Sequence, residues 1–179
     1  MTNAPHGPEG PVYPGTCRSI SADERTAKIS TGEPHSWRLD SAKAAESCGD
    51  LTFQDLLLGT IAVNLDTMGD VVLARRDIAT SYHLAVVTDD AGQKVTLISR
   101  GEDLLSSTHI HRILQDLLGY PEPLYLHHEL VCDAAGERLA TRNDALSIAS
   151  LRSSGYTPAE VLERLPPMPS LLGNLPGGT

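Results

Sequence analysis

Apolar runs and a helical pattern alternate between residues 70 and 133, and this alternation limits the fold more than any other feature of the sequence. The runs at 94–101 and 123–133 have the composition of strands. The segment between them, residues 106–119, has the apolar spacing of a helix. Strands that alternate with helices are typical of a parallel sheet. We therefore predict an α/β fold whose ligands bind beyond the carboxyl ends of the strands.

The segment 106–119 is expected to be the most regular helix of the chain. Ser107 or Thr108 can cap its beginning, and Gly119 is suited to end it. Its apolar side chains form one stripe, which should face the core: Ile110, Ile113, Leu114, Leu117 and Leu118.

The secondary structure of the other segments is less sharply predicted by the sequence. Residues 70–76 are a β-branched run and are expected to form a strand, whereas residues 81–90 fit either a helix or a strand. After the second strand of the alternation, two helical pieces are expected up to about residue 165. Three shorter strand-like runs, which suggest a small antiparallel insertion, lie at 35–39, 51–55 and 59–64.

The chain divides into four segments on this basis. Residues 1–16 are rich in proline and glycine and form a stub, and residues 17–68 form the insertion, with a helix after the capping-box residues Ser21 and Glu24. Residues 69–165 form the α/β part, and residues 166–179 form a flexible tail.

Charge and composition exclude some classes of function. A formal net charge of -9 argues against non-specific nucleic-acid binding, although a local basic site stays possible. The sequence has neither an apolar stretch of about 20 residues nor a signal-peptide pattern, so no membrane association is expected. Three scattered cysteines are typical of reduced thiols, and a cytoplasmic location is expected.

Histidine pairs raise the question of a metal site. His109 and His111 point about 200° apart on a helix, and His127 and His128 face opposite sides of a strand. Neither pair can chelate one ion by itself, so we interpret these four residues as polar side chains with satisfied hydrogen bonds.

A second metal hypothesis concerns Tyr13 and Cys17, which are four residues apart across a Pro-Gly turn. A thiolate and a phenolate are half of a tetrahedral zinc site. The sequence has no C-x-C or C-x-x-C pair to complete it, so no zinc is expected there.

Arginines stand at two places where an anion could bind. Arg100 ends a predicted strand, where its planar fork of donors can hold a carboxylate or can form a surface ion pair. Arg138 and Arg142 lie on the polar turn 132–144, which is either a solvated loop or an anion site.

Five ordered segments together resemble one family. They are GDVVLARRD, SYHLAVVTDD, LISRGEDLLSST, LYLHHELVCDAAGERL and DALSIASLRSSGYTPAEVLERL. In order and spacing they are similar to the second half of the Rossmann-type catalytic domain of glutamyl-tRNA synthetases, which are class I aminoacyl-tRNA synthetases. The resemblance covers residues 11–165 and is strongest to the short glutamyl-Q tRNA(Asp) synthetases, whose connecting region resembles YPGTCR and GEPHSWRLD.

The resemblance implies a role for several residues. It implies that residues 69–165 are the second half of the catalytic domain and that 17–68 are an α+β connecting insertion. Tyr82 and Arg100 stand where the family binds glutamate, and Tyr13 and Cys17 stand where some members have their last two zinc ligands. The first two zinc ligands are absent here, so the pair is expected to be an empty relic.

Two departures from the family pattern concern ATP. The sequence contains no H-I-G-H type motif. The K-M-S-K-S type loop corresponds to Arg138, Leu139, Ala140, Thr141 and Arg142, with Ala140 and Thr141 in place of the serine and the lysine. Loss of one such electrostatic contact commonly costs about 3 to 4 kcal/mol of transition-state stabilisation. Thr141, Arg138 and Arg142 are the candidate ATP-binding residues.

The resemblance thus implies a ligase that uses ATP, glutamate and tRNA(Asp). We expect the chain to be truncated and inactive alone, or to be completed by a separate N-terminal half. The alternatives are a non-catalytic remnant or interaction module, and a fragment of a glutamyl-tRNA synthetase.

Overall fold

The main sheet of the molecule has four strands in the order β5-β4-β8-β7. A computed structural model describes residues 6–7, 10–66, 68–133, 138–139 and 147–165. Strand β8 (Leu124–His128) is parallel to β7 (Leu97–Gly101) and to β4 (Thr52–Asp55), and β4 forms an antiparallel hairpin with β5 (Gly59–Ala62). The predicted α/β class is confirmed.

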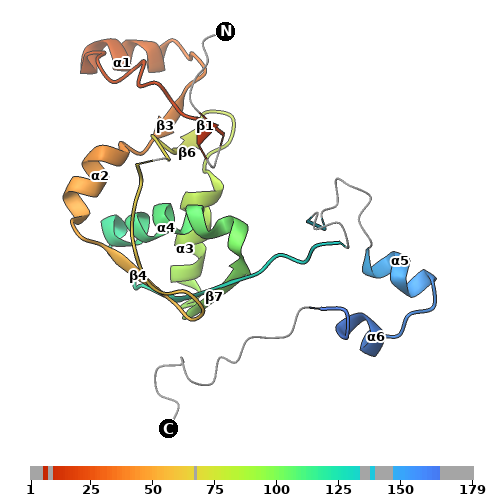
Figure 1. The fold of residues 1–179 in the computed structure, drawn as a ribbon. Coiled ribbons are helices and arrows are strands. Elements are labelled where there is room, and N and C mark those ends of the chain that lie inside the picture. The colour runs from red at the N-terminus through yellow and green to blue at the C-terminus, as the bar shows by residue number, and fades with distance from the viewer. Residues whose placement is uncertain (1–5, 8–9, 67, 134–137, 140–146, 166–179) are drawn as a thin grey trace.

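Helix α4 (Leu105–Leu118) connects the parallel strands β7 and β8 and follows a short 3-10 turn, η1 (Glu102–Leu104). It lies between the sheet and two further helices, α2 (Ser41–Cys48) and α3 (Tyr82–Gly92), as Figure 1 shows. Residues 81–90, which fit a helix or a strand by sequence, are helical because Ser81 caps the helix and accepts a hydrogen bond from the Leu84 N–H at 3.4 Å.

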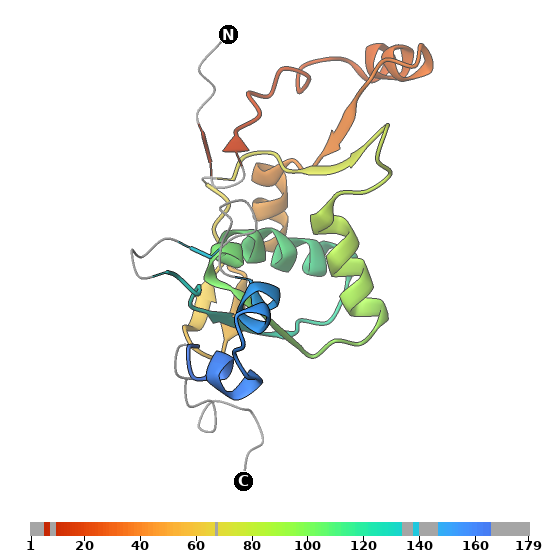
Figure 2. The ribbon, with the colours of Figure 1, turned by 90° about the vertical axis from the view of Figure 1, so that its right-hand side faces the viewer.

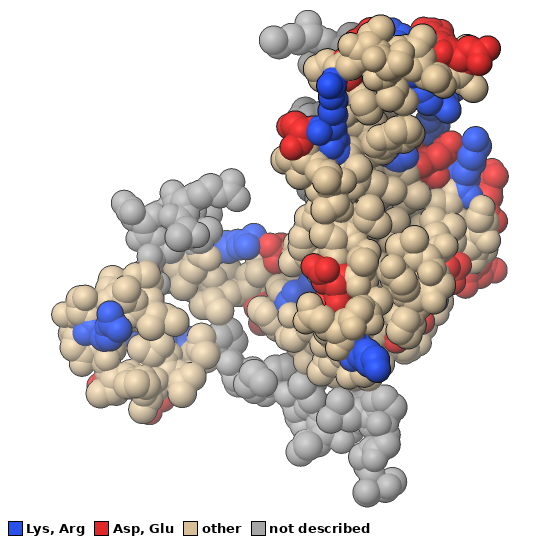
Figure 3. All heavy atoms as spheres, turned by 180° about the vertical axis from the view of Figure 1, so that it is seen from behind, with Lys and Arg blue, Asp and Glu red and all other residues tan. Residues whose placement is uncertain are grey.

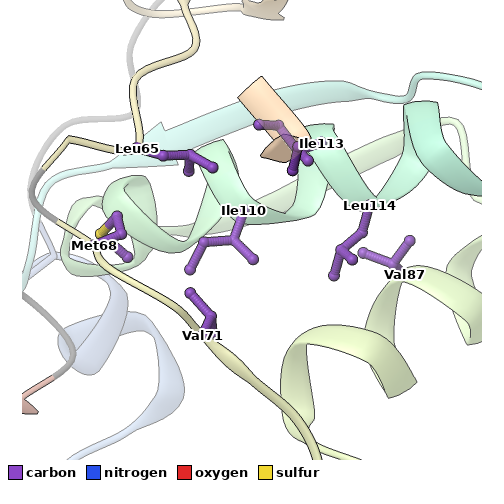
Figure 4. Packing of buried hydrophobic residues seen from close by; sticks show 8 residues of the cluster. Leu65, Met68, Val71, Val87, Ile110, Ile113 and Leu114 are labelled. Atoms are coloured by element: carbon purple, nitrogen blue, oxygen red, sulfur yellow. The ribbon is translucent and has the colours of Figure 1, made fainter. Parts of the chain in front are cut away.

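The core lies around helix α4. Figure 4 shows Leu114 of α4 directed toward Val87 of α3, and Ile110 above Val71. Ile110 and Ile113 are 0% and 1% exposed. The cluster consists of Ala44, Leu65, Met68, Val71, Val87, Ile110, Ile113 and Leu114.

Two expectations about helix α4 are wrong. The helix begins at Leu105, and its N-cap residue Leu104 makes no side-chain cap bond. Because the chain is already helical from residue 102, Ser107 and Thr108 lie inside the helix, and both are buried. At the other end, the buried residues of α4 stop at Gln115, so the last turn meets solvent. The residues expected in the apolar stripe there, Leu117 and Leu118, are 46% and 43% exposed.

The end of α4 is as expected. Gly119 adopts φ 68°, a left-handed conformation that closes the helix and that glycine adopts without the steric cost of a side chain.

The predicted strand at 70–76 does not join the main sheet. Strand β6 (Val72–Arg75) pairs antiparallel with β3 (Ser36–Arg38) in a separate two-stranded sheet. The three short runs of the expected insertion therefore do not form one sheet, since β4 and β5 belong to the main sheet. The reason is that residues far apart in the sequence decide which strands pair, and local composition does not record them.

Contacts also cross the expected boundary at residue 68. Arg18 holds the buried Asp70 carboxylate through two hydrogen bonds, of 2.9 Å and 2.5 Å, and Ser41 donates its N–H to the same carboxylate at 3.2 Å. The division into segments stays a prediction, but the described parts on either side of residue 68 pack together.

The remaining elements lie toward the two ends of the chain. Strands β1 (His6–Gly7) and β2 (Gly10–Pro11) pair with each other. Helix α1 (Ala22–Ser30) is capped by Ser21, whose hydroxyl accepts the Glu24 N–H at 3.1 Å, as the capping-box spacing predicts. Helices α5 (Ile148–Ser153) and α6 (Pro158–Leu162) stand beside the sheet in Figure 1 and in front of it in Figure 2. The expected tail at 166–179 lies outside the described residues.

In the described part of the chain, no helix has the length and apolar character needed to cross a bilayer.

Candidate functional site

A cluster of polar side chains fills the space between the carboxyl ends of the parallel strands and helix α4. Arg100 of β7 and His127 of β8 are partners in the parallel register, and Asp55 ends β4. Side chains alternate between the two faces of a strand, so this register directs all three to the face that α4 covers. The Arg100 cluster, as we call it, comprises Asp55, His83, Arg100, Thr108, His111 and His127.

Arg100 is the centre of this cluster. Its Nε donates to His127 Nε2 at 3.2 Å and its Nη1 donates to His111 Nδ1 at 3.0 Å. Its Nη2 donates to the Thr108 hydroxyl. A guanidinium has five N–H donors, so two have no partner among the described residues. Within the described part of the chain, Arg100 forms no ion pair with a carboxylate, and its charge is held in place by neutral groups. Such a cation is suited to bind an anionic ligand.

Asp55 supports the cluster from the neighbouring strand. Its Oδ2 lies 2.6 Å from His127 Nδ1, and both side chains are fully buried. Its Oδ1 accepts the N–H groups of Leu57 and Leu58 at 2.8 and 2.9 Å. Burial by itself would raise the pKa of Asp55, but the hydrogen bonds from His127, Leu58 and Leu57 outweigh it and lower the pKa. The carboxylate is therefore ionised.

His111 links the cluster to the solvent-facing residue Tyr82. Because Nδ1 of His111 accepts from Arg100, the neutral ring carries its hydrogen on Nε2 and donates it to His83 Nδ1 at 3.1 Å. Burial and the Arg100 charge lower the pKa of His111 to about 3. The Tyr82 ring, 51% exposed, lies 5.6 Å from the His111 ring between centroids. The structure thus brings Tyr82 and Arg100, the two residues predicted to bind glutamate, into contact with the same histidine.

Acidification is expected to destabilise the protein through His111. The unfolded chain takes up a proton near the ordinary pKa of 6.5, whereas the folded chain keeps this ring neutral down to about 3. Stability should therefore fall as the pH falls from about 6.5, by up to about 1.4 kcal/mol per pH unit from this residue. Urea unfolding between about pH 6.5 and pH 5, where few carboxylates titrate, measures the slope. An unchanged slope in His111→Gln would contradict the assignment.

The predicted ATP loop is described only in part. Arg138 forms a 2.6 Å ion pair with Asp103, and the Leu139 N–H donates to the Val131 carbonyl at 2.9 Å. Gly101 makes room for this arrangement, because a Cβ there would lie 2.5 Å from Asp103 Oδ1. The charge of Arg138 is thus already partly neutralised. Ala140, Thr141 and Arg142 lie outside the described residues, so an ATP-binding role for this loop stays a prediction.

Tyr13 and Cys17 lie close together and are joined by a hydrogen bond between the tyrosine side chain and the cysteine backbone. The Tyr13 hydroxyl accepts the Cys17 N–H at 2.7 Å, and the Arg38 guanidinium lies 4.6 Å above the Tyr13 ring. Among the described residues, no group of three or more possible metal ligands occurs. Two ligands do not fit a four-coordinate structural zinc site.

Sequence reasoning missed most of the Arg100 cluster. His111 and His127 are satisfied polar residues, as interpreted, but their partners were not foreseen. Asp55 and His127 are 72 residues apart, and His83 and His111 are 28 apart. The one usable signal was the strand alternation that places Arg100 and His127 opposite α4, and this needed the register of the sheet.

The fold and this site define a class of protein. Charged side chains at the carboxyl ends of parallel strands, joined by a crossover helix, are typical of the Rossmann-type α/β proteins. The model of the family described as tRNA synthetases class I (E and Q), catalytic domain, matches residues 2–168. The chain belongs to this family.

Individual relatives agree with this assignment. The glutamyl-Q tRNA(Asp) synthetase of Rhodobacter capsulatus is 45% identical over 163 residues, which are 88% of this chain and 57% of the relative. The Nocardia farcinica protein of the same name is 42% identical and covers 90% and 49%. A crystal structure of a glutamate tRNA ligase from Elizabethkingia meningosepticum, in complex with its amino acid, has a TM-score of 0.58 at 25% identity and covers 78% of this chain and 26% of that one. The chain spans about half the length of the curated relatives it matches.

Proposed function

We propose that these residues form the glutamate-recognition part of a glutamyl-Q tRNA(Asp) synthetase, which activates glutamate with ATP and transfers it to queuosine of tRNA(Asp). The single observation that carries the proposal is Arg100, which has two unused N–H donors and no carboxylate partner in the described region. A carboxylate of glutamate accepts two parallel hydrogen bonds from such a fork. Tyr82, exposed beside His111, is the second residue that would contact the amino acid.

Activation itself needs more than these 179 residues supply. When a carboxylate attacks the α-phosphate of ATP and pyrophosphate leaves, negative charge builds on phosphoryl oxygens and must meet fixed cations. The sequence has no H-I-G-H type motif, Thr141 replaces the loop lysine, and Arg138 is paired with Asp103. We propose that the chain binds glutamate but does not activate it unless an ATP-binding half is added, as a further part of the polypeptide or as a separate chain.

A non-catalytic interaction module is the second candidate, and the replacement of the loop serine and lysine by Ala140 and Thr141 favours it. A fragment of a glutamyl-tRNA synthetase is the third, since the same amino-acid site would serve it. The two synthetases differ in the RNA that accepts glutamate, so the acceptor distinguishes them.

Acidic and basic side chains lie next to one another on the face shown in Figure 3, which gives no continuous basic surface there.

We also propose a cytoplasmic location. In the described structure Cys17, Cys48 and Cys132 are free thiols, and Cys17 and Cys132 are exposed. Free thiols of this kind persist in a reducing compartment.

Glutamate-dependent exchange of pyrophosphate into ATP tests the proposal. The 179 residues alone are expected to show no exchange, and addition of the first half of the Rhodobacter capsulatus relative is expected to restore it. L-Glutamine in place of L-glutamate is the control for specificity. Exchange of pyrophosphate into ATP by the chain alone would show that no second half is required. If the chain neither binds L-glutamate nor gains activity with the added half, the interaction module is the better reading.

Restored activity then allows the acceptor to be tested. Transfer of labelled glutamate to queuosine-containing tRNA(Asp) is expected, and transfer to the 3′ end of a glutamate tRNA would identify the third candidate instead.

A further inference from the structure

Asp55 has no contact with the two unused donors of Arg100, yet it is connected to Arg100 through His127. The ionised carboxylate can only accept hydrogen bonds, so the contact of 2.6 Å to His127 Nδ1 places the ring hydrogen on Nδ1. Burial and the Arg100 charge disfavour the protonated ring, and they lower the pKa of His127 against the opposing effect of Asp55. The neutral ring therefore has a lone pair on Nε2.

This lone pair is what Arg100 requires. Its Nε–H points at His127 Nε2 at 3.2 Å, and the Thr108 hydroxyl, which accepts from Nη2, lies 2.8 Å from the same nitrogen. If the ring carried its hydrogen on Nε2 instead, a donor would face a donor, and the guanidinium would have to turn away. The same rotation would redirect the two donors that are left for a ligand.

We propose that Asp55 is a positioning residue, which holds His127 in the Nδ1–H tautomer and thereby fixes the direction in which Arg100 presents its two free N–H groups to glutamate. The inference rests on the proposed function of Arg100. It assigns to Asp55 and His127 a part in substrate recognition although neither touches the substrate. Hydrogen-bonded partners that orient a histidine in this way act similarly behind metal ligands and catalytic histidines.

The variant Asp55→Asn tests this role. The amide oxygen can still accept the N–H groups of Leu57 and Leu58, but the amide NH₂ now faces His127 Nδ1 and donates to it. The same NH₂ replaces the oxygen that accepts the backbone N–H of His127 at 3.0 Å, so this buried hydrogen bond is lost as well, and it is lost equally in the His127→Gln background. The ring hydrogen must move to Nε2. We expect the ¹⁵N NMR spectrum to show this exchange of the two ring nitrogens, and the protected Arg100 Nε–H signal of the wild-type protein to disappear. L-Glutamate should bind about 10-fold more weakly. Asp66→Asn, an exposed loop residue, is the matched control.

The substitution Asp55→Asn can also be made in a protein that already carries His127→Gln, which keeps the inference testable if Asp55→Asn affects folding. In the variant His127→Gln, the amide oxygen can accept the hydrogen bond from Arg100, and no ring tautomer has to be selected for this. Asp55→Asn added to this variant should change the L-glutamate affinity by less than about twofold, whereas a purely structural role would give the full loss again. The NMR spectrum of the wild-type protein is also decisive by itself, since a hydrogen on His127 Nε2 would overturn the inference.

Failure of the inference and failure of the proposed function give different results. If Arg100→Lys loses L-glutamate and Asp55→Asn does not, the positioning role is refuted and the proposed function stands. If the wild-type protein binds no L-glutamate, the proposed function is refuted, and the Arg100 Nε–H signal then decides whether Asp55 orients Arg100. An unchanged signal in Asp55→Asn refutes that orientation.

Discussion

Replacement of Arg100 by lysine is expected to weaken L-glutamate binding by about 100-fold, which corresponds to about 2.7 kcal/mol. Lysine keeps the positive charge but has one ammonium group in place of the planar fork. It cannot satisfy His127, His111 and Thr108 and still offer two parallel donors to a carboxylate. Calorimetric titration with L-glutamate measures the change.

The matched control for Arg100→Lys is Arg112→Lys. Arg112 lies on helix α4, donates to the Thr52 carbonyl at 3.0 Å and pairs with Glu122; within the described part of the chain, none of its hydrogen bonds or ion pairs involves the Arg100 cluster. Its replacement should leave L-glutamate binding within about twofold. Equal affinities of wild-type protein and Arg100→Lys would show that the free donors of Arg100 do not hold the ligand.

The substitution Ile110→Ala is expected to reduce the free energy of unfolding by about 3 kcal/mol. Ile110 is 0% exposed and lies where α4 meets Val71 and the rest of the core cluster, as Figure 4 shows. The change removes buried apolar surface and leaves a cavity that close-packed neighbours can fill only in part. Since whole domains are stable by only about 5 to 15 kcal/mol, the loss is a large share of the total.

Urea unfolding followed by circular dichroism measures this loss. Ile148→Ala is the matched control, because the same side chain is 75% exposed on α5. Its effect should stay within about 0.5 kcal/mol. If both variants lost the same stability, core packing around Ile110 would not be the cause; helix propensity cannot explain a loss in either variant, since alanine is the better helix former.

Local patterns predicted much of the secondary structure. The apolar spacing at 106–119 identified α4, glycine identified its end, and the capping-box residues identified α1, because these features depend on neighbours within one or two turns. The beginning of α4 was misplaced because the chain is already helical in η1, and a hydroxyl that resembles a cap by sequence is a buried partner of Arg100 in the fold.

The Arg100 cluster was predictable only in part. Arg100 and Tyr82 were singled out by the strand end and by the family resemblance, and both contact His111 in the structure; their role in glutamate binding stays a prediction. The zinc relic and the ATP loop stay predictions, the latter with Ala140, Thr141 and Arg142 outside the described residues. Asp55 was not foreseen, since nothing near residue 55 in the sequence indicates that β4 pairs with β8.

The sequence by itself determined the class of fold, the position of the crossover helix and the presence of an arginine at the end of a parallel strand. These follow from periodicity and from short-range chemistry, which a single chain records locally. Tertiary structure alone decided that β4 joins the main sheet, that Asp55 reaches His127, and that Arg100 has three neutral partners and two free donors among the residues that the structure describes. Those outcomes depend on which distant residues meet and on how deeply they are buried, because burial lowers the pKa of His111 and of His127, and the hydrogen-bond partners of each ring decide its tautomer.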